Sequence, residues 1–511
     1  MLARVYSGAV LGIDSYIVEV EVDIASGLPS FSTVGLPDGA VKESRERVRA
    51  AIKNSGYSFP PEKITVNLAP ADIKKEGAGF DLPISIGILA ASGLVEKDKL
   101  GEYLLVGELS LDGRVKPARG LLPITLGAKK EHARGIILPV ENASEAGVVE
   151  GIDVLPVRHL SEAVDFLNGE RDIKPIKVDI DALFSEINRY PVDFSDVKGQ
   201  ELAKRALEIA AAGNHNIIMI GPPGSGKTML AQRLPTILPP LTFEEALETT
   251  KIFSVSGILN KPLMTVRPFR SPHHTISDAG LIGGGQLPKP GEVSLAHNGV
   301  LFLDELPEFR KNVLEMLRQP IEDGRVTIAR ASVTLTYPSR FLLVAALNPC
   351  PCGYFGDSVH QCRCSATQIQ RYRSKLSGPL LDRIDLHIDV PNVNFDDLAT
   401  DRGIENSEKI RSRVMSARKV QLERFNKNRG IFCNSQMGPR LIKKFCNVDE
   451  NCENLLRMAI DRLGLSARGY HRILKIARTI ADLASSECIE ESHLAEAIQY
   501  RTLDRDYFGQ F

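Results

Sequence analysis

The sequence predicts a multidomain α/β protein, with a first α/β domain, a central parallel sheet surrounded by helices, and a helical C-terminal region. The chain has 511 residues, which is too long for one compact core and typical of about three domains. In the central part, short and almost wholly apolar runs alternate with helical stretches, as in buried parallel strands joined by helices. After residue 394 the strand signals fade and helical periodicity continues, which predicts the helical C-terminal region.

The composition is that of an ordinary globular protein. Hydrophobic residues make up 43% of the chain and charged residues 25%, and no low-complexity tract interrupts them. The formal net charge of -1 gives no general attraction to nucleic acid, so any contact with phosphates must come from local basic patches. The most apolar run, residues 84–95, is too short to span a bilayer, and residues 1–10 lack the apolar core of a signal peptide. We therefore expect a cytoplasmic protein with no membrane partner.

The first α/β domain is expected over residues 1–170. Helical stretches such as residues 40–55 alternate there with β-like runs at 16–22, 63–68, 103–106 and 135–138. A segment of mixed charge containing Pro175 and Pro191 follows, and it predicts a linker over residues 171–196.

The central domain is expected over residues 197–394 and the helical lid over residues 395–511. Three apolar runs predict buried strands at 216–220, 300–303 and 341–347. Helical periodicity is found at 408–425, 452–463, 466–484 and 491–500. The sequence therefore predicts a doubly wound parallel sheet followed by a bundle of helices.

A glycine-rich loop directly follows the first of these strands and precedes a helical run. It reads Gly221-Pro222-Pro223-Gly224-Ser225-Gly226-Lys227-Thr228, which matches the phosphate-binding loop pattern in full and in the context that the pattern requires. Glycines let backbone N–H groups surround the phosphates, Lys227 reaches the terminal phosphates, and the Thr228 hydroxyl coordinates Mg²⁺. The sequence therefore predicts an ATP site with Mg²⁺, and a chance structural loop is the alternative.

The other two central strands also end in polar side chains. Asp304 and Glu305 end the second strand, where Asp304 can hold the Mg²⁺ shell and Glu305 can polarise the attacking water. Asn348 ends the third strand and is suited to positioning that water or contacting the γ-phosphate. A helix cap for the two acids and a turn before Pro349 are the alternative interpretations.

Four of the eight cysteines lie close together in the sequence. Cys350, Cys352, Cys362 and Cys364 form two pairs with one-residue spacers, and tetrahedral thiolate sites favour Zn²⁺, although two-residue spacers are commoner. We expect a structural zinc site, because four protein ligands leave no open position on the metal. Reduced thiols or a redox pair are the alternatives, and His360 is a substitute ligand. The remaining cysteines, Cys433, Cys446, Cys452 and Cys488, show no ligand spacing.

Several motifs together resemble known families. The chain resembles the magnesium-chelatase-like AAA+ ATPases in the three strand ends and in two further motifs, Leu380-Leu381-Asp382-Arg383-Ile384-Asp385 and Ser466-Ala467-Arg468-Gly469-Tyr470-His471. The chain resembles the bacterial YifB/ComM family more closely. This resemblance rests on three further motifs, Val34-Gly35-Leu36-Pro37-Asp38-Gly39, Asn67-Leu68-Ala69-Pro70-Ala71-Asp72 and Asn348-Pro349-Cys350-Pro351-Cys352-Gly353. The resemblance covers nearly the whole chain and implies an AAA+ core with a lid of the magnesium-chelatase C-terminal type.

This resemblance implies roles for two arginines. Arg383 falls where an arginine finger enters the neighbouring subunit's site, and Arg468 corresponds to a sensor arginine on the lid. A cation supplied by assembly suits the charge that develops on the γ-phosphate. Both roles imply a homo-oligomeric ring, which we expect to be a hexamer. A surface salt bridge is the alternative for Arg383, and Arg468 has Arg472 one helical turn away as a competing candidate.

Residues 323–337 are predicted to form a β-hairpin whose tip lies near Arg330, Ala331 and Ser332. Related ring helicases place such a hairpin in the central channel, so the resemblance makes Arg330 the candidate contact to single-stranded or branched DNA. An ordinary exposed arginine is the alternative. Residues 280–285 and Lys289 resemble a second loop insertion of the family, in which glycines suit a moving loop. His273 and His274 are interpreted as hydrogen-bonded structural residues rather than metal ligands.

Residues 16–168 resemble the proteolytic domain of Lon, notably in Lys75-Glu76-Gly77-Ala78-Gly79 and in the run from Gly107 to Pro117. The Ser–Lys pair of that protease would fall at Gly79 and Leu122, which can act neither as nucleophile nor as base. We therefore expect a degenerate Lon-protease-like domain used for assembly, partner docking or nucleic-acid contact.

Three classes of function remain open. The family resemblance implies an ATP-driven DNA motor that promotes branch migration of recombination intermediates during natural transformation. The alternatives are the ATPase subunit of a magnesium chelatase and an ATP-dependent protease. The missing catalytic pair argues against the protease, and the Lon-like domain and cysteine cluster argue against the chelatase. The basic run 409–429 could face DNA or a subunit, although its interspersed acids favour a solvated helix face.

Overall fold

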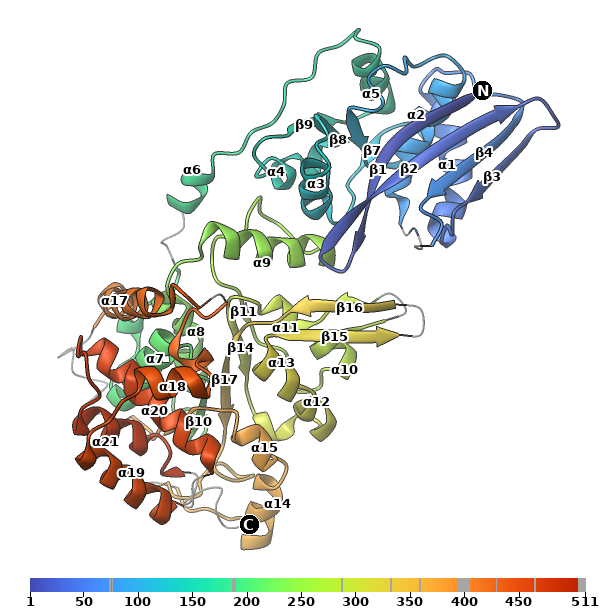
Figure 1. The fold of residues 1–511 in the computed structure, drawn as a ribbon. Coiled ribbons are helices and arrows are strands. Elements are labelled where there is room, and N and C mark those ends of the chain that lie inside the picture. The colour runs from blue at the N-terminus through green and yellow to red at the C-terminus, as the bar shows by residue number, and fades with distance from the viewer. Residues whose placement is uncertain are drawn as a thin grey trace. The chain divides into compact units, whose positions relative to one another are not determined.

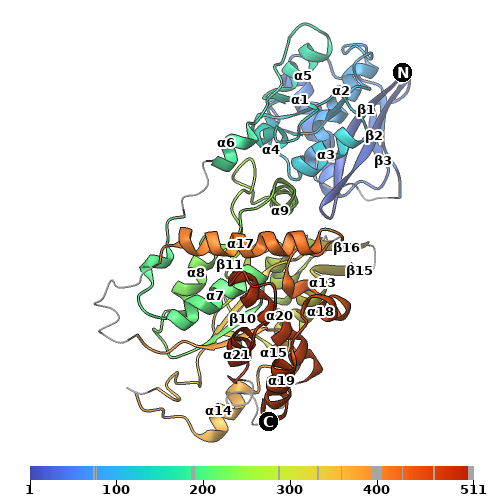
Figure 2. The same cartoon turned by 60° about the vertical axis from the view of Figure 1, so that its left-hand side comes forward.

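The chain forms two compact units in the computed structural model, which describes residues 1–72, 75, 77–185, 190–285, 288–330, 333–357, 360–393, 405–428, 430–463 and 466–503. The first unit contains residues 1–186 and 243–265, and the second contains residues 187–242 and 266–511. Their elements are labelled in Figures 1 and 2. Among the residues described, no helix is both long and apolar enough to cross a membrane.

A mixed sheet forms the centre of the first unit. Within its described residues, seven strands follow the order β3-β4-β2-β1-β5-β8-β9. Their bounds are β1 (Leu2–Leu11), β2 (Asp14–Ala25), β3 (Ser30–Val34), β4 (Lys63–Ala69), β5 (Tyr103–Leu105), β8 (Gly135–Pro139) and β9 (Asp153–Val157). β1 and β2 form a long antiparallel pair, whereas β5, β8 and β9 run parallel. The short strands β6 (Glu108–Leu109) and β7 (Val115–Lys116) pair with each other.

The first unit also contains helices. They are α1 (Gly39–Asn54), η1 (Ala78–Phe80), α2 (Asp81–Ala91), α3 (Leu121–Lys130), η2 (Val140–Asn142), α4 (Ala143–Ala146), α5 (Leu160–Leu167), α6 (Ile180–Ser185) and α9 (Phe243–Ser256). α1 begins after Asp38, whose carboxylate accepts a hydrogen bond of 2.8 Å from the Val41 N–H, as helix caps do. Every residue of α2 is buried. The apolar run that is too short to span a membrane therefore forms a core helix.

Helix α9 joins the first unit from the middle of the sequence. It packs against α3, and the Gly120 N–H donates a hydrogen bond of 3.2 Å to the Ser254 carbonyl. Lys251 also lies 3.5 Å from the Asp14 carboxylate. Residues 243–265 fall inside the range expected for the central domain, yet their packing assigns them to the first unit.

A parallel sheet forms the centre of the second unit. Within its described part, five strands follow the order β11-β14-β17-β10-β18. Their bounds are β10 (Ile217–Ile220), β11 (Phe269–Arg270), β14 (Val300–Leu303), β17 (Leu342–Leu347) and β18 (Leu386–Asp389). All residues of β10, β14 and β17 are buried, as expected of central parallel strands. Two separate hairpins pair β12 (Gly283–Gly284) with β13 (Lys289–Pro290) and β15 (Arg325–Arg330) with β16 (Val333–Pro338).

The helices of the second unit fall into two sets. The set that precedes the lid in the sequence is η3 (Phe194–Asp196), α7 (Glu201–Gly213), α8 (Lys227–Ile237), α10 (Asp278–Ile282), α11 (Glu292–Leu295), η4 (Leu306–Glu308), α12 (Lys311–Met316), α13 (Arg318–Asp323), α14 (Ala366–Arg373) and α15 (Gly378–Leu381). The C-terminal set is α17 (Ser407–Phe425), η5 (Asn434–Gln436), α18 (Pro439–Phe445), α19 (Glu450–Leu463), α20 (Ala467–Leu483) and α21 (Glu491–Gln499). One hydrophobic cluster contains residues of both sets and of the strands, so the lid packs directly on the sheet domain.

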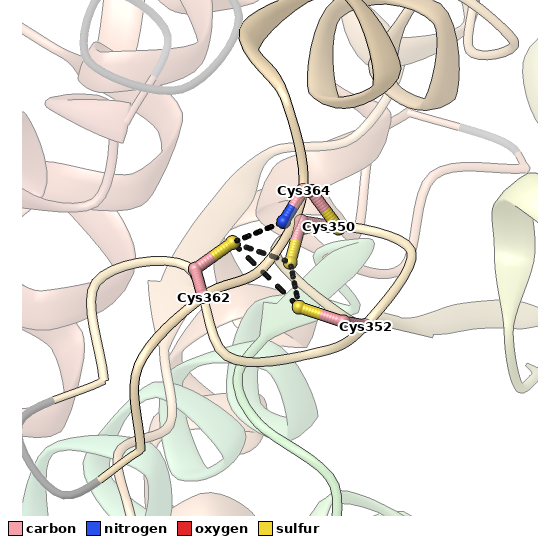
Figure 3. Close-up of side chains that lie close together, drawn as sticks. All are labelled: Cys350, Cys352, Cys362 and Cys364. Carbon is pink, nitrogen blue, oxygen red and sulfur yellow. Dashed lines mark hydrogen bonds between the residues drawn. The ribbon is translucent and has the colours of Figure 1, made fainter.

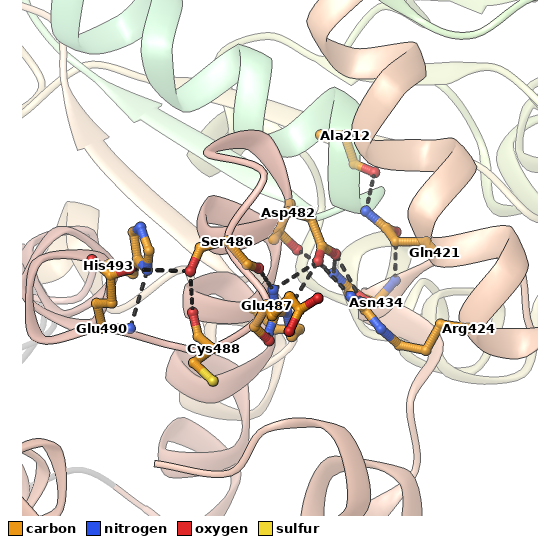
Figure 4. Close-up of polar contacts among 12 residues, drawn as sticks. Ala212, Gln421, Arg424, Asn434, Asp482, Ser486, Glu487, Cys488, Glu490 and His493 are labelled. Atoms are coloured by element: carbon orange, nitrogen blue, oxygen red, sulfur yellow. Dashed lines mark hydrogen bonds and ion pairs between the residues drawn. The ribbon is translucent and has the colours of Figure 1, made fainter. Parts of the chain in front are cut away.

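Polar contacts also fasten the lid, and Figure 4 shows them around Asp482 of α20. The Asp482 carboxylate accepts hydrogen bonds of 2.8 Å from both Arg424 and Asn434. Nearby, Gln421 of α17 donates to the Ala212 carbonyl of α7 at 3.1 Å, and α17 lies along α7 and α8 (Figure 2).

Three arginines of the basic run on α17 are held within the chain. Arg424 contacts Asp482, Arg418 donates to the Ala211 carbonyl at 2.9 Å, and Arg413 forms an ion pair with Glu208. For these three residues the expected solvated face is therefore wrong, because carboxylates and carbonyls of α7 and α20 face them. Arg429 lies outside the described residues.

The predicted fold class is confirmed: an α/β first unit, a parallel-sheet core and a helical C-terminal lid. The expected central strands and lid helices agree with β10, β14, β17, α17, α19, α20 and α21 to within two residues at each end. The long strand β1 was not among the expected elements.

Candidate nucleotide-binding site

Three motifs meet at one edge of the parallel sheet. β14, β17 and β10 are neighbours in that order and run parallel, so their carboxyl ends lie side by side. Asp304 follows β14, Asn348 follows β17, and the loop 221–226 follows β10. Open parallel sheets bind ligands at this edge.

Glycines give the loop its shape. A Cβ atom at Gly221 would lie 2.1 Å from the Val390 carbonyl oxygen, so no larger residue fits there. Gly226 has a φ of 91°, a left-handed backbone that favours glycine, and α8 begins at the next residue. The sequence therefore folds into the strand–loop–helix geometry that the motif requires.

Lys227 is the first residue of α8, and its side chain points back into the loop. Its Nζ donates hydrogen bonds of 2.8 Å to the carbonyls of both Gly221 and Pro222, and it is 3.3 Å from the Asn348 Oδ1. Burial lowers the pKa of Lys227, although Asp304 and Asp389 oppose that effect. The contact with Asn348 brings together two residues that the sequence separates by more than a hundred positions.

Thr228 and Asp304 are in direct contact. The Thr228 hydroxyl donates a hydrogen bond of 2.8 Å to the Asp304 Oδ2. A hydroxyl and a carboxylate placed side by side are oxygen ligands of the kind that Mg²⁺ prefers, usually together with waters and substrate phosphates. These two side chains therefore fit a magnesium ion.

Glu305 has a partner that the sequence did not reveal. Its backbone has a φ of 52°, and its carboxylate lies 3.4 Å from the His274 Nδ1. The His274 ring lies 4.1 Å from the His273 ring and meets Phe309 edge-on. His274 was expected to be structural, but it faces the acid expected to polarise the attacking water. No local pattern connects residues this far apart in sequence.

The two candidate arginines are not brought to the loop within a single chain. Arg383 forms an ion pair of 2.8 Å with Glu322 and donates to the Pro379 carbonyl at 2.6 Å. Arg468 is exposed in the first turn of α20. Arg472, the alternative candidate, forms an ion pair of 3.2 Å with Asp385.

The predicted hairpin is present and lies against the glycine-rich insertion. The β15–β16 hairpin extends away from the sheet in Figure 1, and Arg330 is exposed at the end of β15. Its guanidinium lies beside Gly284 of β12, and the buried Tyr337 of β16 donates a 2.5 Å hydrogen bond to the Pro288 carbonyl. The two insertions are therefore joined, with Lys289 exposed on β13. Ala331 and Ser332, the expected tip, lie outside the described residues.

The four cysteines converge in the loop between β17 and α14, as Figure 3 shows. All four sulfur atoms lie within 4.8 Å of one another. Backbone N–H groups of Tyr354 and Arg363 donate to Cys352 and lower its thiol pKa to about 6, whereas desolvation raises the pKa of the Cys364 thiol to about 12. His360 lies outside this group, because it pairs with Asp357 at 3.6 Å and stacks on Tyr354.

The two positions expected to correspond to the Lon catalytic pair hold a leucine and a glycine. Leu122 is fully buried in α3. Gly79 lies in η1, where its carbonyl accepts a hydrogen bond of 2.9 Å from the Gly107 N–H.

Family comparisons match three parts of the chain. Residues 193–398 match the family described as magnesium chelatase, subunit ChlI, and residues 404–501 match its C-terminal family. Residues 20–142 match the family described as subunit ChlI of Mg-chelatase. A family described by the name of the chelatase subunit thus also matches most of the first unit's N-terminal part.

Individual proteins are similar over the full length. The chain is 46% identical to competence protein ComM of Haemophilus influenzae over 509 residues, covering 99% of the chain and 98% of that protein. It is also 46% identical to the uncharacterized protein YifB of Escherichia coli over 506 residues, with the same coverage. Lon protease 2 of Bacillus subtilis is 33% identical over 180 residues, which is 32% of each chain.

Proposed function

The chain belongs to the bacterial YifB/ComM family of magnesium-chelatase-like AAA+ ATPases, and from this premise we propose that it is a ring-forming motor that uses ATP to move DNA. The observation that carries the proposal is the 46% identity to ComM along 99% of the chain. Because that relative is named for competence, we propose branch migration of recombination intermediates, as in natural transformation. A cytoplasmic location is part of this proposal.

ATP hydrolysis would use the residues at the sheet edge. The loop 221–226 would surround the phosphates, Lys227 would contact the terminal phosphates, and Thr228 and Asp304 would hold Mg²⁺. Glu305 would polarise the attacking water, and Asn348 would help to position it. The hydrogen bonds from Lys227 to Asn348 and from Thr228 to Asp304 support this assignment, because each joins a residue of the phosphate-binding motif to the end of a neighbouring strand.

Turnover would require a ring of subunits, and we propose a hexamer. Transition-state charge on the γ-phosphate requires a cation near it. Within one chain Arg383 is paired with Glu322, so in the proposal it leaves this carboxylate and enters the site of the next subunit. Arg468 is exposed on the lid and would act as the sensor arginine.

DNA contact is assigned to the joined hairpins. Arg330 and Lys289 are both exposed, and each offers a cation to a phosphate backbone. Local contacts of this kind are necessary, since the net charge of -1 gives the molecule no general attraction to nucleic acid. Single-stranded or branched DNA is the proposed partner.

A magnesium-chelatase ATPase subunit is the second candidate, and the three family matches favour it. Near full-length identity to ComM favours the DNA motor over it. An ATP-dependent protease is disfavoured, because Gly79 and Leu122 supply neither nucleophile nor base.

One assay separates these candidates. ATPase rate is measured at low salt without DNA and with single-stranded, duplex and four-way branched DNA, with Lys227→Ala as the inactive control. We expect branched DNA to stimulate hydrolysis and a labelled four-way junction to be converted to duplexes. If none of these DNAs changes the wild-type ATPase rate, the motor assignment is wrong and the chelatase assignment becomes the leading one.

A further inference from the structure

Three of the four sulfur atoms of the cysteine cluster lie close to the spacing of a metal-bound set, and all four lie within 4.8 Å of one another. Zn–S bonds of about 2.3 Å at tetrahedral angles separate the sulfurs by about 3.8 Å. The Sγ atom of Cys350 lies 3.3 Å from that of Cys352 and 3.7 Å from that of Cys362, and the Cys352 and Cys362 sulfurs are 3.6 Å apart. A disulfide needs about 2.05 Å, so these contacts are not disulfides.

Backbone groups also point at the sulfurs. Tyr354 and Arg363 donate their N–H groups to Cys352, and the Cys364 N–H lies 3.4 Å from the Cys362 sulfur. Such donors fix the orientation of the sulfur atoms, as outer hydrogen bonds do for the ligands of metal sites. The loop thus brings the sulfur atoms together and also directs backbone N–H groups toward them.

The same loop touches the phosphate-binding loop. Gly353, with a φ of 89°, packs so closely on Pro223 that a Cβ atom there would lie 2.5 Å from the proline Cδ. Cys350 comes two residues after Asn348, whose side chain contacts Lys227. The cluster therefore adjoins two parts of the candidate ATP site.

A third contact holds the other side of the loop. Asn392, just beyond β18, donates a hydrogen bond of 2.7 Å to the Asp357 carboxylate. Asp357 also accepts the His360 N–H at 2.7 Å. The loop 350–364 is consequently anchored at the ends of β17 and β18, on both sides of β10.

We propose that one zinc ion is bound by the four thiolates of Cys350, Cys352, Cys362 and Cys364, and that the zinc-bound loop braces the phosphate-binding loop through Gly353 and Pro223. The zinc has no open position and takes no part in the chemistry. Its role is to keep Pro223 and Asn348 in place for nucleotide binding. The zinc proposal does not depend on DNA binding. It can therefore fail while the DNA-motor assignment holds, and it can hold while that assignment fails.

The metal is tested on the full chain, purified without chelator, by elemental analysis. We expect about one Zn²⁺ per chain, with most of it absent from Cys352→Ser. Cys488→Ser is the matched control, because Cys488 is an exposed thiol outside the cluster and its replacement should leave the zinc content unchanged. Metal-free wild-type protein, or full zinc content in Cys352→Ser, overturns the site.

The brace is tested by Gly353→Ala, which keeps all four ligands. We expect it to retain zinc but to bind a fluorescent ATP analogue on the order of tenfold more weakly, because the added methyl displaces Pro223. Gly356→Ala is the matched control, since Gly356 lies in the same loop with a φ of 82° and has nothing within 4 Å of its Cβ position. Equal nucleotide affinity in the two variants overturns the brace.

Discussion

At the scale of single residues, replacement of Glu305 is the most direct test of the proposed ATP hydrolysis. Glu305→Gln should leave ATP binding intact and reduce turnover by about a hundredfold or more, because the loop and magnesium ligands are untouched while the water loses its base. Phosphate release and ATP-analogue affinity measure the two effects separately. Glu308→Gln is the control, since Glu308 is a nearby acid paired with Lys375 at 3.2 Å. Normal turnover in Glu305→Gln removes the residue from the mechanism.

Glu145 makes the stability of the first unit depend on pH. Burial raises its pKa to about 7, although Asn142 and the backbone N–H groups of Leu121 and Leu122 donate to it. A carboxyl group whose folded pKa is raised favours folding below its ordinary pKa, and this contribution disappears as pH rises through about 7. The shift corresponds to about 3 kcal/mol at most.

Glu145→Gln should therefore flatten this pH dependence. Between pH values of about 5 and 8, the thermal midpoint of the wild type should fall more than that of the variant, because the amide cannot ionise. Glu141→Gln, which changes an exposed acid in the adjoining η2, should behave as the wild type does. Parallel curves for Glu145→Gln and wild type would show that this carboxyl group does not titrate as described.

The sequence identified the groups at the sheet edge but not their partners. The residues after the apolar strands could be predicted, because adjacent parallel strands bring their ends together. The pairing of His274 with Glu305 could not, since a histidine in a loop carries no spacing signal toward an acid 31 residues away. Likewise, Glu322 as the partner of Arg383 depends on the tertiary structure, which brings the end of α13 next to the residue that follows α15 by two positions.

At the scale of elements, the β15–β16 hairpin is the part that should separate DNA coupling from hydrolysis. Arg330→Ala should weaken binding to all DNA sequences alike and lower the slope of log K against log salt by about one, because one cation fewer neutralises a phosphate. Basal ATPase activity should survive while its stimulation by DNA falls. Binding is measured by fluorescence anisotropy over a salt series.

Arg325→Ala is the matched control for that hairpin experiment. Arg325 is exposed on the same strand, but it pairs with Pro338 at the opposite end from the tip. Its replacement should change DNA binding less than the replacement of Arg330. Equal effects of the two substitutions would indicate general surface charge instead of a contact near the tip.

Local patterns predicted most elements and left long-range packing open. The runs that became β10, β14 and β17 are wholly buried, so their sequence carries a strong signal. β1 was missed although its partner β2 is local, since Leu11 pairs with Asp14 across a tight turn; only its other partner, β5, is distant in the sequence. Long-range packing hid the internal contacts of Arg413, Arg418 and Arg424, whose carboxylate and carbonyl partners lie on other helices.

At the scale of the whole molecule, action of Arg383 between subunits predicts rescue by mixing. Arg383→Ala and Lys227→Ala chains should each be inactive alone, yet regain part of the ATPase activity when co-assembled, since one interface then joins an intact loop to an intact arginine. The double variant, with both changes in one chain, mixed with either single variant gives the baseline. Activity of the mixture no higher than this baseline would place Arg383 in cis or in a structural role.

The path of α9 has a consequence for how such a protein can change over evolutionary time. The chain enters the second unit at residue 187, returns to the first for residues 243–265, and then re-enters the second, so the two units are interleaved rather than consecutive. A recombination event that exchanged residues 1–186 alone would leave α9, with its buried Ile252 and Phe253, facing a foreign partner. Inheritance of the two units is therefore linked: a replacement of the first is tolerated only if the new domain brings, or accepts, the helix that the ATPase sequence encodes.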